Sequence, residues 1–290
     1  MITQKSSTIA VAGATGKQGG AVARALIKRG YKVRAFTRQP GSIPARLLAQ
    51  LGAEVVYGDL ADPASLNKVL ESVTAVFGVT TPFGTSVESE TVYGCNLIDA
   101  ARANKVNHFV FSSAAQANLG TGIPHFESKY LIERYLAGAG MSWTVIAPAA
   151  FMDDFESGWY RHSLDHGKLQ LVMPPKTPLQ FICSEDIGEF AALALDHSER
   201  FNGQRVDIAG DELTGENLAK LFSKAYGQTI AYEEVPLERA EAYSPDLASM
   251  FGYFQKVGLH IDISALHKTY PEIVFHSFAS WIAERCWQPD

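Results

Sequence analysis

The sequence predicts an α/β fold in which a doubly wound parallel sheet is joined to a small mixed C-terminal lobe. Through residues 1–150, short apolar segments alternate with segments whose apolar residues recur at helical spacing. Alternation of this kind builds parallel βαβ units. A glycine-rich turn joins the first apolar segment to the first helical one, as in sheets that bind dinucleotides. We therefore expect a Rossmann-type domain at residues 1–150. A smaller α/β lobe is expected at residues 151–290, partly interleaved with the first sheet.

The composition is that of a globular protein with one large domain and a smaller appendage. Hydrophobic residues make up 47% of the 290 positions, which is enough for a sizeable core. The net charge is −6 and no block of Lys and Arg stands out, so a nucleic-acid partner is not expected. No apolar stretch approaches the ~20 residues of a membrane span, and the N-terminus lacks the apolar core of a signal peptide. We expect a cytoplasmic protein without a membrane partner.

The cysteines and histidines give no metal or hydrolase signature. Cys95, Cys183 and Cys286 are scattered, and the histidines are dispersed. The patterns Cys-x-x-Cys, His-Glu-x-x-His and Gly-x-Ser-x-Gly do not occur in the sequence. No metal ligands are therefore assigned.

The glycine-rich turn carries the strongest functional signal. Three glycines lie at a spacing of three, between an apolar strand at residues 8–11 and a helix at residues 21–29. The first glycine permits a tight turn, the second lets a pyrophosphate approach the backbone, and the third lets the helix pack closely. The helix N-terminus offers free N–H groups and a partial positive charge to phosphates. A glycine turn without a ligand is the alternative. We assign to a dinucleotide site Gly13, Ala14, Thr15, Gly16, Lys17, Gln18 and Gly19.

The carboxyl ends of the later strands supply further candidate residues. Strands are predicted at residues 32–37, 54–57, 73–79, 107–112 and 143–148. In open α/β sheets, ligands bind outside the carboxyl ends of the strands. Asp59 suits either the adenine edge or an ordinary turn, and Thr80-Thr81-Pro82 suits either a passing coenzyme or a plain connection. The candidates from these ends are Arg38, Asp59, Leu60, Thr80, Thr81, Pro82 and Ser112.

Arg38 favours one nicotinamide coenzyme over the other. Sites for NAD carry an acidic residue near the end of the second strand, where it accepts hydrogen bonds from the ribose 2′-OH. No carboxylate lies between Gly20 and Glu54, and Arg38 takes that place. A guanidinium suits a 2′-phosphate, so the sequence predicts NADP, with NAD as the alternative coenzyme. The alternative role for Arg38 is that of a solvated surface residue.

Five motifs in one order resemble the NmrA-like family of atypical short-chain dehydrogenases/reductases, over nearly the whole chain. They are the glycine-rich run, Arg38, His125-Phe126-Glu127-Ser128-Lys129, Pro148-Ala149-Ala150-Phe151-Met152 and Asp186-Ile187-Gly188. The resemblance implies a Rossmann domain that holds NADP(H) or NAD(H). It adds Pro148 and Phe151 to the coenzyme site, and Lys129 as the ligand of the nicotinamide ribose. Some members sense nicotinamide redox state and bind regulatory proteins, whereas quinone and isoflavone-type reductases of the wider group are enzymes.

One departure from the superfamily limits what is carried over about catalysis. Typical members use Tyr-x-x-x-Lys, in which the tyrosine exchanges a proton with the substrate carbonyl. Lys129 matches this pattern, but His125 occupies the tyrosine position. Histidine transfers protons near neutral pH, so His125 and Lys129 are the candidate catalytic residues. The alternative is a capping histidine and a solvated lysine.

Two functions follow from the resemblance and this departure. The first is an NADP(H)-binding redox sensor or regulator with weak or no turnover, working with a regulatory protein partner. The alternative is an NADPH-dependent reductase of a quinone or other small carbonyl compound, with the aromatic segment 151–160 covering the substrate. An interaction protein with a vestigial site is a third, which the intact glycine turn disfavours.

Overall fold

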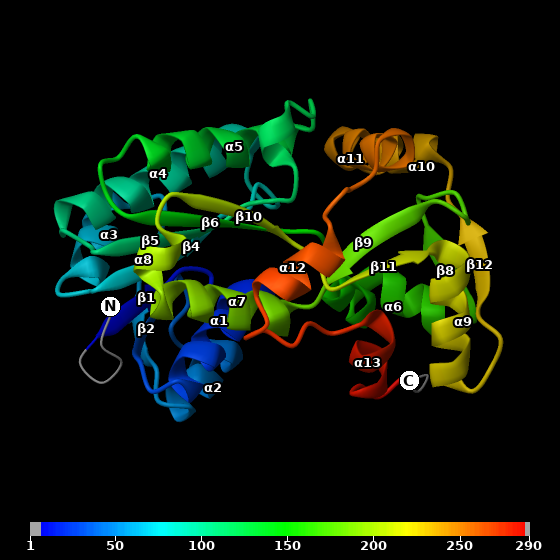
Figure 1. Ribbon diagram of the computed structural model, residues 1–290, viewed down its shortest axis with the longest axis horizontal. Coiled ribbons are helices and arrows are strands. Elements are labelled where there is room, and N and C mark those ends of the chain that lie inside the picture. The colour runs from blue at the N-terminus through cyan, green and yellow to red at the C-terminus, as the bar shows by residue number, and fades with distance from the viewer. Residues whose placement is uncertain (1–6, 288–290) are drawn as a thin grey trace. The chain divides into compact units, whose positions relative to one another are not determined.

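The computed structural model describes residues 7–287 and divides the chain into two compact units (Figure 1). The first unit consists of Met1–Gly120, His125–Ala147 and Ile187–Asp207. The second consists of Thr121–Pro124, Pro148–Asp186 and Ile208–Asp290. The chain thus passes into the second unit at residue 148 and returns to the first unit for residues 187–207.

The first unit is built on a seven-stranded sheet with the order β10-β6-β5-β4-β1-β2-β3. Every pairing from β6 through to β3 is parallel. The strand order reverses between β1 and β4, which is the point at which such sheets bind ligands. The strands are β1 (Thr8–Val11), β2 (Lys32–Thr37), β3 (Glu54–Tyr57), β4 (Ala75–Val79), β5 (His108–Ser112), β6 (Trp143–Pro148) and β10 (Gln204–Ile208).

Helices cover both faces of this sheet, which confirms the predicted doubly wound fold. Figure 1 shows α3, α4 and α5 on one face and α1 and α7 on the other. The bounds are α1 (Lys17–Lys28), α2 (Ile43–Gln50), α3 (Pro63–Leu70), α4 (Val87–Ala103), the 3-10 helix η1 (Ala117–Leu119), α5 (Pro124–Ala137), α7 (Ser184–Asp196) and α8 (Ser198–Phe201).

Small residues let these helices approach one another. A Cβ on Gly188 of α7 would lie 2.8 Å from the Ala21 carbonyl of α1, and a Cβ on Gly94 of α4 would meet the Ile132 side chain of α5 at 2.6 Å. Each contact is shorter than a Cβ tolerates, so only glycine permits this packing. Apolar side chains from α3, α4 and α5 form one buried cluster with those of the strands, including Phe109.

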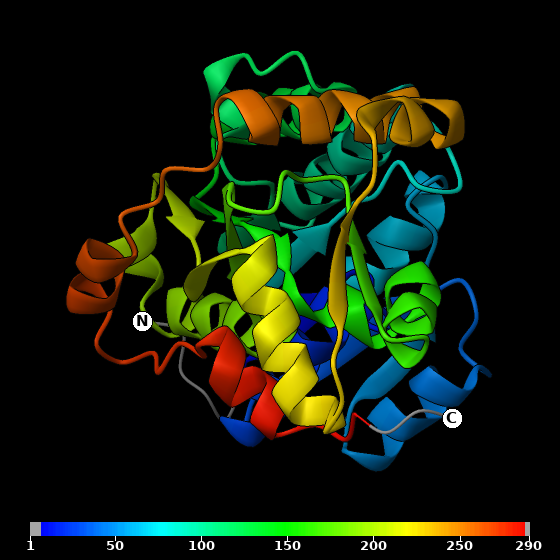
Figure 2. The same cartoon turned by 90° about the vertical axis from the view of Figure 1, so that its right-hand side faces the viewer.

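The second unit combines two small sheets with short helices. One sheet has the order β11-β9-β7, and in the other β12 lies parallel to β8. Helix α9 packs against α13, the yellow and red helices of Figure 2. The elements are β7 (Ala150–Phe151), the 3-10 helix η2 (Met152–Glu156), α6 (Gly158–Asp165), β8 (Lys168–Leu171), β9 (Pro178–Ile182), β11 (Asp211–Thr214), α9 (Gly215–Tyr226), β12 (Ala231–Glu234), α10 (Leu237–Tyr243), α11 (Pro245–Lys256), α12 (Ile263–Thr269) and α13 (Phe278–Ala283).

Aromatic packing in the second unit corrects part of the predicted substrate cover. Phe155 is buried, with its ring centroid 5.4 Å from that of Phe222 and 5.5 Å from that of Phe278. Met152 is also fully buried. Both side chains therefore belong to the core of this unit and do not cover a substrate, whereas Trp159 of the same segment is exposed.

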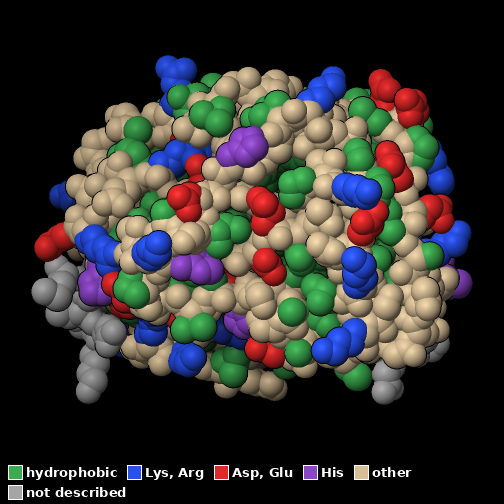
Figure 3. Space-filling model, turned by 45° about the vertical axis from the view of Figure 1, so that its right-hand side comes forward, with side chains coloured by type: hydrophobic (Ala, Val, Ile, Leu, Met, Phe, Trp, Pro, Cys, Tyr) green, Lys and Arg blue, Asp and Glu red, His purple; other side chains and the backbone are tan. Residues whose placement is uncertain are grey.

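Two further observations concern the distribution of surface charge and the apolar character of the helices. Figure 3 shows acidic and basic side chains interspersed on one face of the molecule. Within residues 7–287, none of the helices combines the length and the apolar character needed to cross a membrane.

Candidate functional site

The glycine turn between β1 and α1 has the geometry that its sequence predicts. Gly13 has φ +60°, a conformation that residues with side chains rarely adopt, and a Cβ there would lie 2.9 Å from Cγ1 of Val79. A Cβ on Gly19 would lie less than 3.0 Å from the carbonyl oxygens of Ala12 and Gly13. The third glycine therefore lets the start of α1 rest directly on the end of β1.

The N-terminus of α1 is shaped to receive an anion. Gly16 is the N-cap residue, and no side chain caps the helix. The first helical bond runs from the Gly20 N–H to the Gly16 carbonyl at 3.0 Å, so the N–H groups of residues 17–19 precede it. The first turn contains Lys17 and no acidic residue. The free N–H groups and the positive charge at this end of the helix favour the binding of a phosphate group.

Arg38 follows β2 and is exposed to solvent. Within residues 7–287 its guanidinium has neither an ion-pair nor a hydrogen-bond partner. It therefore retains its full capacity to bind an anionic group, as a 2′-phosphate would require. Its role in coenzyme choice stays a prediction.

The turn after β3 shows which groups of Asp59 and Leu60 are already engaged. The Asp59 Oδ1 accepts a hydrogen bond from the Ala61 N–H at 3.0 Å, which stabilises the turn. The Leu60 carbonyl accepts a bond from Nδ2 of Asn96 at 2.9 Å. Asp59 therefore stabilises the turn, which is one of the two roles that its sequence position suggested. Its contact with adenine stays a prediction.

The residues after β4 and β5 connect these strands to neighbouring helices. Ser112 at the end of β5 donates a hydrogen bond through Oγ to Oε1 of Gln18 at 2.6 Å, which joins two predicted site residues. Thr81 is exposed and its Oγ1 accepts a bond from the Phe83 N–H, whereas Pro82 is buried. Thr80 is buried and belongs to the ion-pair cluster described next.

Lys129 forms a buried ion pair that the sequence did not predict. Its Nζ lies 2.7 Å from Oε1 of Glu90 and donates a second bond to the Thr80 carbonyl at 2.8 Å. Glu90 is fully buried, and it also accepts hydrogen bonds from the hydroxyls of Thr80 and Ser128. The interpretation of Lys129 as a solvated lysine is therefore wrong.

Glu90 had a recognisable signal in the sequence. It lies on the face of α4 that also carries Gly94, Leu97 and Ile98, all buried and at helical spacing. A carboxylate on an apolar helix face needs a cationic or hydrogen-bonding partner. Only the fold identifies Lys129 and Thr80 as those partners.

His125 lies near the start of α5, next to two aromatic rings. Its ring centroid lies 4.9 Å from that of Phe126, edge to face, and 5.9 Å from that of Phe83. The residue is buried. Helix α5 thus carries both candidate catalytic residues, the histidine among aromatic rings and the lysine in an ion pair.

Pro148 and Phe151 belong to the second unit. Pro148 ends β6, and Phe151 pairs with Ile182 of β9 through β7. Their contribution to the coenzyme site, which rests on the resemblance alone, stays a prediction.

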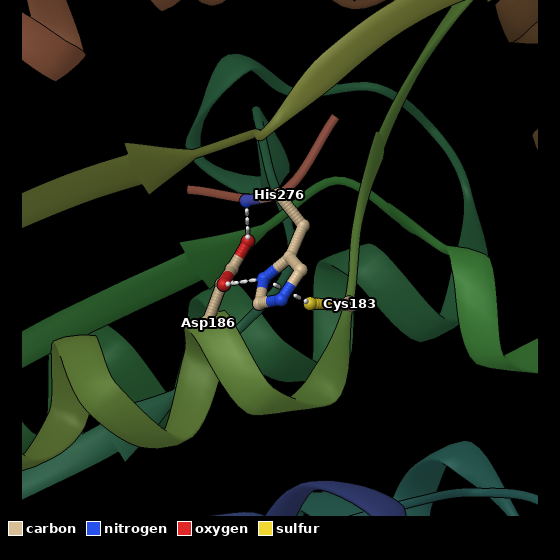
Figure 4. Close-up of side chains that lie close together, drawn as sticks. All are labelled: Cys183, Asp186 and His276. Atoms are coloured by element: carbon tan, nitrogen blue, oxygen red, sulfur yellow. Dashed lines mark hydrogen bonds and ion pairs between the residues drawn. The ribbon is translucent and has the colours of Figure 1, made fainter. Parts of the chain in front are cut away.

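A second polar cluster lies within the second unit, where Cys183, Asp186 and His276 meet (Figure 4). The Asp186 carboxylate accepts bonds from the backbone N–H of His276 at 2.8 Å and from its Nδ1 at 2.6 Å. The Cys183 Sγ lies 3.5 Å from the same Nδ1. Burial raises the pKa of the Cys183 thiol well above its usual range, so the thiol is a poor nucleophile. The cluster anchors the segment around His276 to the start of α7.

The Asp186–His276 pair predicts a pH dependence of stability. Burial alone would lower the pKa of His276, but its hydrogen bond to Asp186 and the charge of Asp186 outweigh burial and raise that pKa above 6.5. The stabilisation from this pair is therefore complete below about pH 6.5 and is lost as the pH rises through the folded-state pKa. We expect the melting temperatures of wild type and His276→Gln to differ most at pH 6 and to converge toward pH 9. A difference that grows with pH would contradict this assignment.

Comparison with known proteins assigns the chain to a protein family. The sequence profile of the NmrA-like family matches residues 5–279. The chain belongs to the NmrA-like family. One relative in this family, the NmrA-like family domain-containing oxidoreductase hkm9 of Aspergillus hancockii, is 32% identical over 280 residues. The match covers 86% of this chain and 83% of the relative.

Solved structures with this fold include both a reductase and a regulator. The NADPH-dependent quinone oxidoreductase of Escherichia coli, crystallised with NADPH, superposes with a TM-score of 0.79 at 22% identity, covering 95% of this chain and 99% of that one. NmrA, a negative transcriptional regulator crystallised with NADP, superposes with a TM-score of 0.76 at 20% identity, covering 97% and 95%. At these identities the likeness establishes the fold and leaves the activity open.

Proposed function

We propose that this NmrA-like protein binds NADP(H) at the carboxyl edge of its parallel sheet. In this proposal it acts as a nicotinamide redox sensor or regulator with little or no turnover. The uncapped N-terminus of α1 would receive the pyrophosphate, and the exposed Arg38 would bind the 2′-phosphate. The presence of NADP(H) in crystals of the quinone oxidoreductase and of NmrA supports this coenzyme.

The proposal of weak turnover rests on the interactions of Lys129 and on the residue at the tyrosine position. When bound, the coenzyme supplies or accepts a hydride, and a carbonyl reductase must then provide a proton to the substrate oxygen. The tyrosine position is occupied by His125, a buried residue whose ring lies next to those of Phe83 and Phe126. The ammonium of Lys129 is engaged by Glu90 and the Thr80 carbonyl. This arrangement suits coenzyme binding better than proton transfer to a carbonyl.

Binding and turnover are tested separately. Calorimetry should show affinities in the micromolar range for NADPH and NADP⁺. NADPH oxidation should stay at background with a panel of aldehydes, enones and quinones. Robust turnover that is lost in His125→Ala would overturn the sensor proposal, and the absence of binding to either coenzyme would overturn the proposed site itself.

Arg38 provides a sharper test of coenzyme choice. Arg38→Ala should weaken NADPH binding about 10-fold or more, since a charge-assisted hydrogen bond contributes about 1.5–3 kcal/mol. NADH lacks the 2′-phosphate, so its affinity should stay within about twofold of wild type. Arg46→Ala is a suitable control, because Arg46 is an exposed residue bonded to the Gly41 carbonyl. Equal losses for the two coenzymes in Arg38→Ala would refute the role of Arg38.

A reductase of quinones is the second candidate. The relative from Aspergillus hancockii is named as an oxidoreductase, and this chain is 32% identical to it. A quinone requires little acid assistance when it accepts hydride, so the missing tyrosine weighs less against this substrate class. Turnover in the same panel that is confined to quinones, and is unaffected in His125→Ala, would support this candidate over the sensor.

A further inference from the structure

The buried Glu90–Lys129 pair lies at the carboxyl end of β4, in the half of the sheet that the nicotinamide would occupy. Arg38 directly follows β2, so a coenzyme with its 2′-phosphate there extends its other half across the β1–β4 reversal toward β4 and β5. Lys129 donates to the carbonyl of Thr80, the residue that directly follows β4. The turn at Gly13 lies close to Val79, the last residue of β4, since a Cβ on Gly13 would lie 2.9 Å from Cγ1 of Val79. The ion pair therefore lies next to the proposed path of the coenzyme.

We infer that Glu90 sets the relative affinity for oxidised and reduced coenzyme by cancelling the charge of Lys129. This inference rests on the proposed NADP(H) site. The oxidised nicotinamide ring carries a positive charge that the reduced ring lacks. An unpaired ammonium in a poorly solvated region opposes a nearby positive ring, because Coulomb interactions there are screened weakly. A carboxylate 2.7 Å from the ammonium offsets that repulsion and lets both coenzyme forms bind.

The hydrogen bonds around Glu90 fix its carboxyl group in place beside Lys129. Its side chain is 0% exposed and that of Lys129 is 10% exposed, so water screens the pair little. One carboxylate oxygen accepts bonds from the Lys129 ammonium and the Thr80 hydroxyl, and the other accepts from the Ser128 hydroxyl. Donors on both oxygens hold the carboxylate in one orientation. The two opposite charges thus act as one neutral unit.

The experiment measures the ratio of the dissociation constants for NADP⁺ and NADPH by calorimetry. Glu90→Gln leaves an unpaired ammonium, so this ratio should rise about 10-fold, equivalent to 1.4 kcal/mol. Lys129→Met leaves an unpaired carboxylate, so the ratio should fall by a similar factor. The double variant is neutral again and should return to within about threefold of wild type. A merely structural role would weaken both coenzymes together and leave the ratio unchanged.

Glu90→Asp is the matched control, because it keeps the charge while shortening the side chain. Its ratio should match that of wild type even where both affinities fall. Circular dichroism verifies folding, and if Glu90→Gln does not fold, the comparison of Lys129→Met with the double variant decides alone. Unchanged ratios in the single variants, or shifts in the same direction, would overturn this inference while the coenzyme site stands. Failure of wild type to bind either form would overturn the proposed function and this inference with it.

Discussion

Replacing Gly19 by alanine is expected to abolish measurable coenzyme binding and to lower the free energy of unfolding by about 1–3 kcal/mol. The new Cβ would lie less than 3.0 Å from the carbonyl oxygens of Ala12 and Gly13, which are backbone atoms and cannot rotate away as the end of a flexible side chain can. Helix α1 must therefore move away from β1, and the N–H groups that would hold the pyrophosphate move with it. Urea unfolding followed by circular dichroism measures the first effect, and calorimetry with NADPH measures the second.

Gly16→Ala separates binding from folding. Gly16 has φ −98°, an ordinary extended conformation, and its Cβ would come no closer than 3.4 Å to the Gly13 carbonyl oxygen. We expect this variant to retain its free energy of unfolding within about 1 kcal/mol. Coenzyme affinity should still fall, because the added methyl occupies the space in which a pyrophosphate approaches the backbone. If Gly16→Ala destabilised the protein as much as Gly19→Ala, the assigned roles of the two glycines would be wrong.

The sequence was sufficient to predict six of the seven strands of the first sheet, because their signals are local. The seventh strand, β10, lies within the segment that we assigned to the C-terminal lobe. Strands buried on both faces of a parallel sheet read as continuous apolar runs, as in β1 and β6. The strands β1, β2, β3 and β6 occupy the predicted residues. The starts of some helices also have local signals in the sequence. Asp62 caps α3 by accepting bonds from the N–H groups of Ala64 and Ser65, and Pro63 follows it.

Signals in the second unit were weaker and more dispersed. The last described segment, residues 275–287, contains only the short helix Phe278–Ala283. Strands β8 and β12 carry no clear strand pattern, because their sequences mix polar and apolar residues over only 4 positions each. Pairing between them is tertiary information that no local pattern contains.

The same contrast between local and long-range information applies to the residues of the candidate site. The glycine turn and Arg38 were predicted because a short motif specifies each of them. The partner of Lys129 was not, since Glu90 lies 39 residues away in the chain and meets it only when α4 packs beside α5. The Asp186–His276 pair likewise spans 90 residues.

Lys129→Met is expected to lower the free energy of unfolding by about 3–5 kcal/mol, the usual result of leaving one member of a buried ion pair uncompensated. Methionine fills the volume of the lysine stem, so the loss comes mainly from the stranded Glu90 carboxylate. Guanidinium unfolding of the apoprotein measures this effect without any coenzyme. Arg102→Met is the control, because the Arg102–Asp99 pair is 58% and 45% exposed and should contribute less than about 1 kcal/mol.

The double variant Glu90→Gln/Lys129→Met distinguishes charge from packing as the source of that loss. Glutamine retains an acceptor for the hydroxyls of Thr80 and Ser128 but carries no charge that needs a partner. If the stranded charge dominates, the double variant should be at least about 2 kcal/mol more stable than Lys129→Met alone. If packing dominates, the second substitution should add a further loss. These unfolding measurements require no ligand. They therefore test the electrostatic coupling of Glu90 and Lys129 separately from its effect on coenzyme preference.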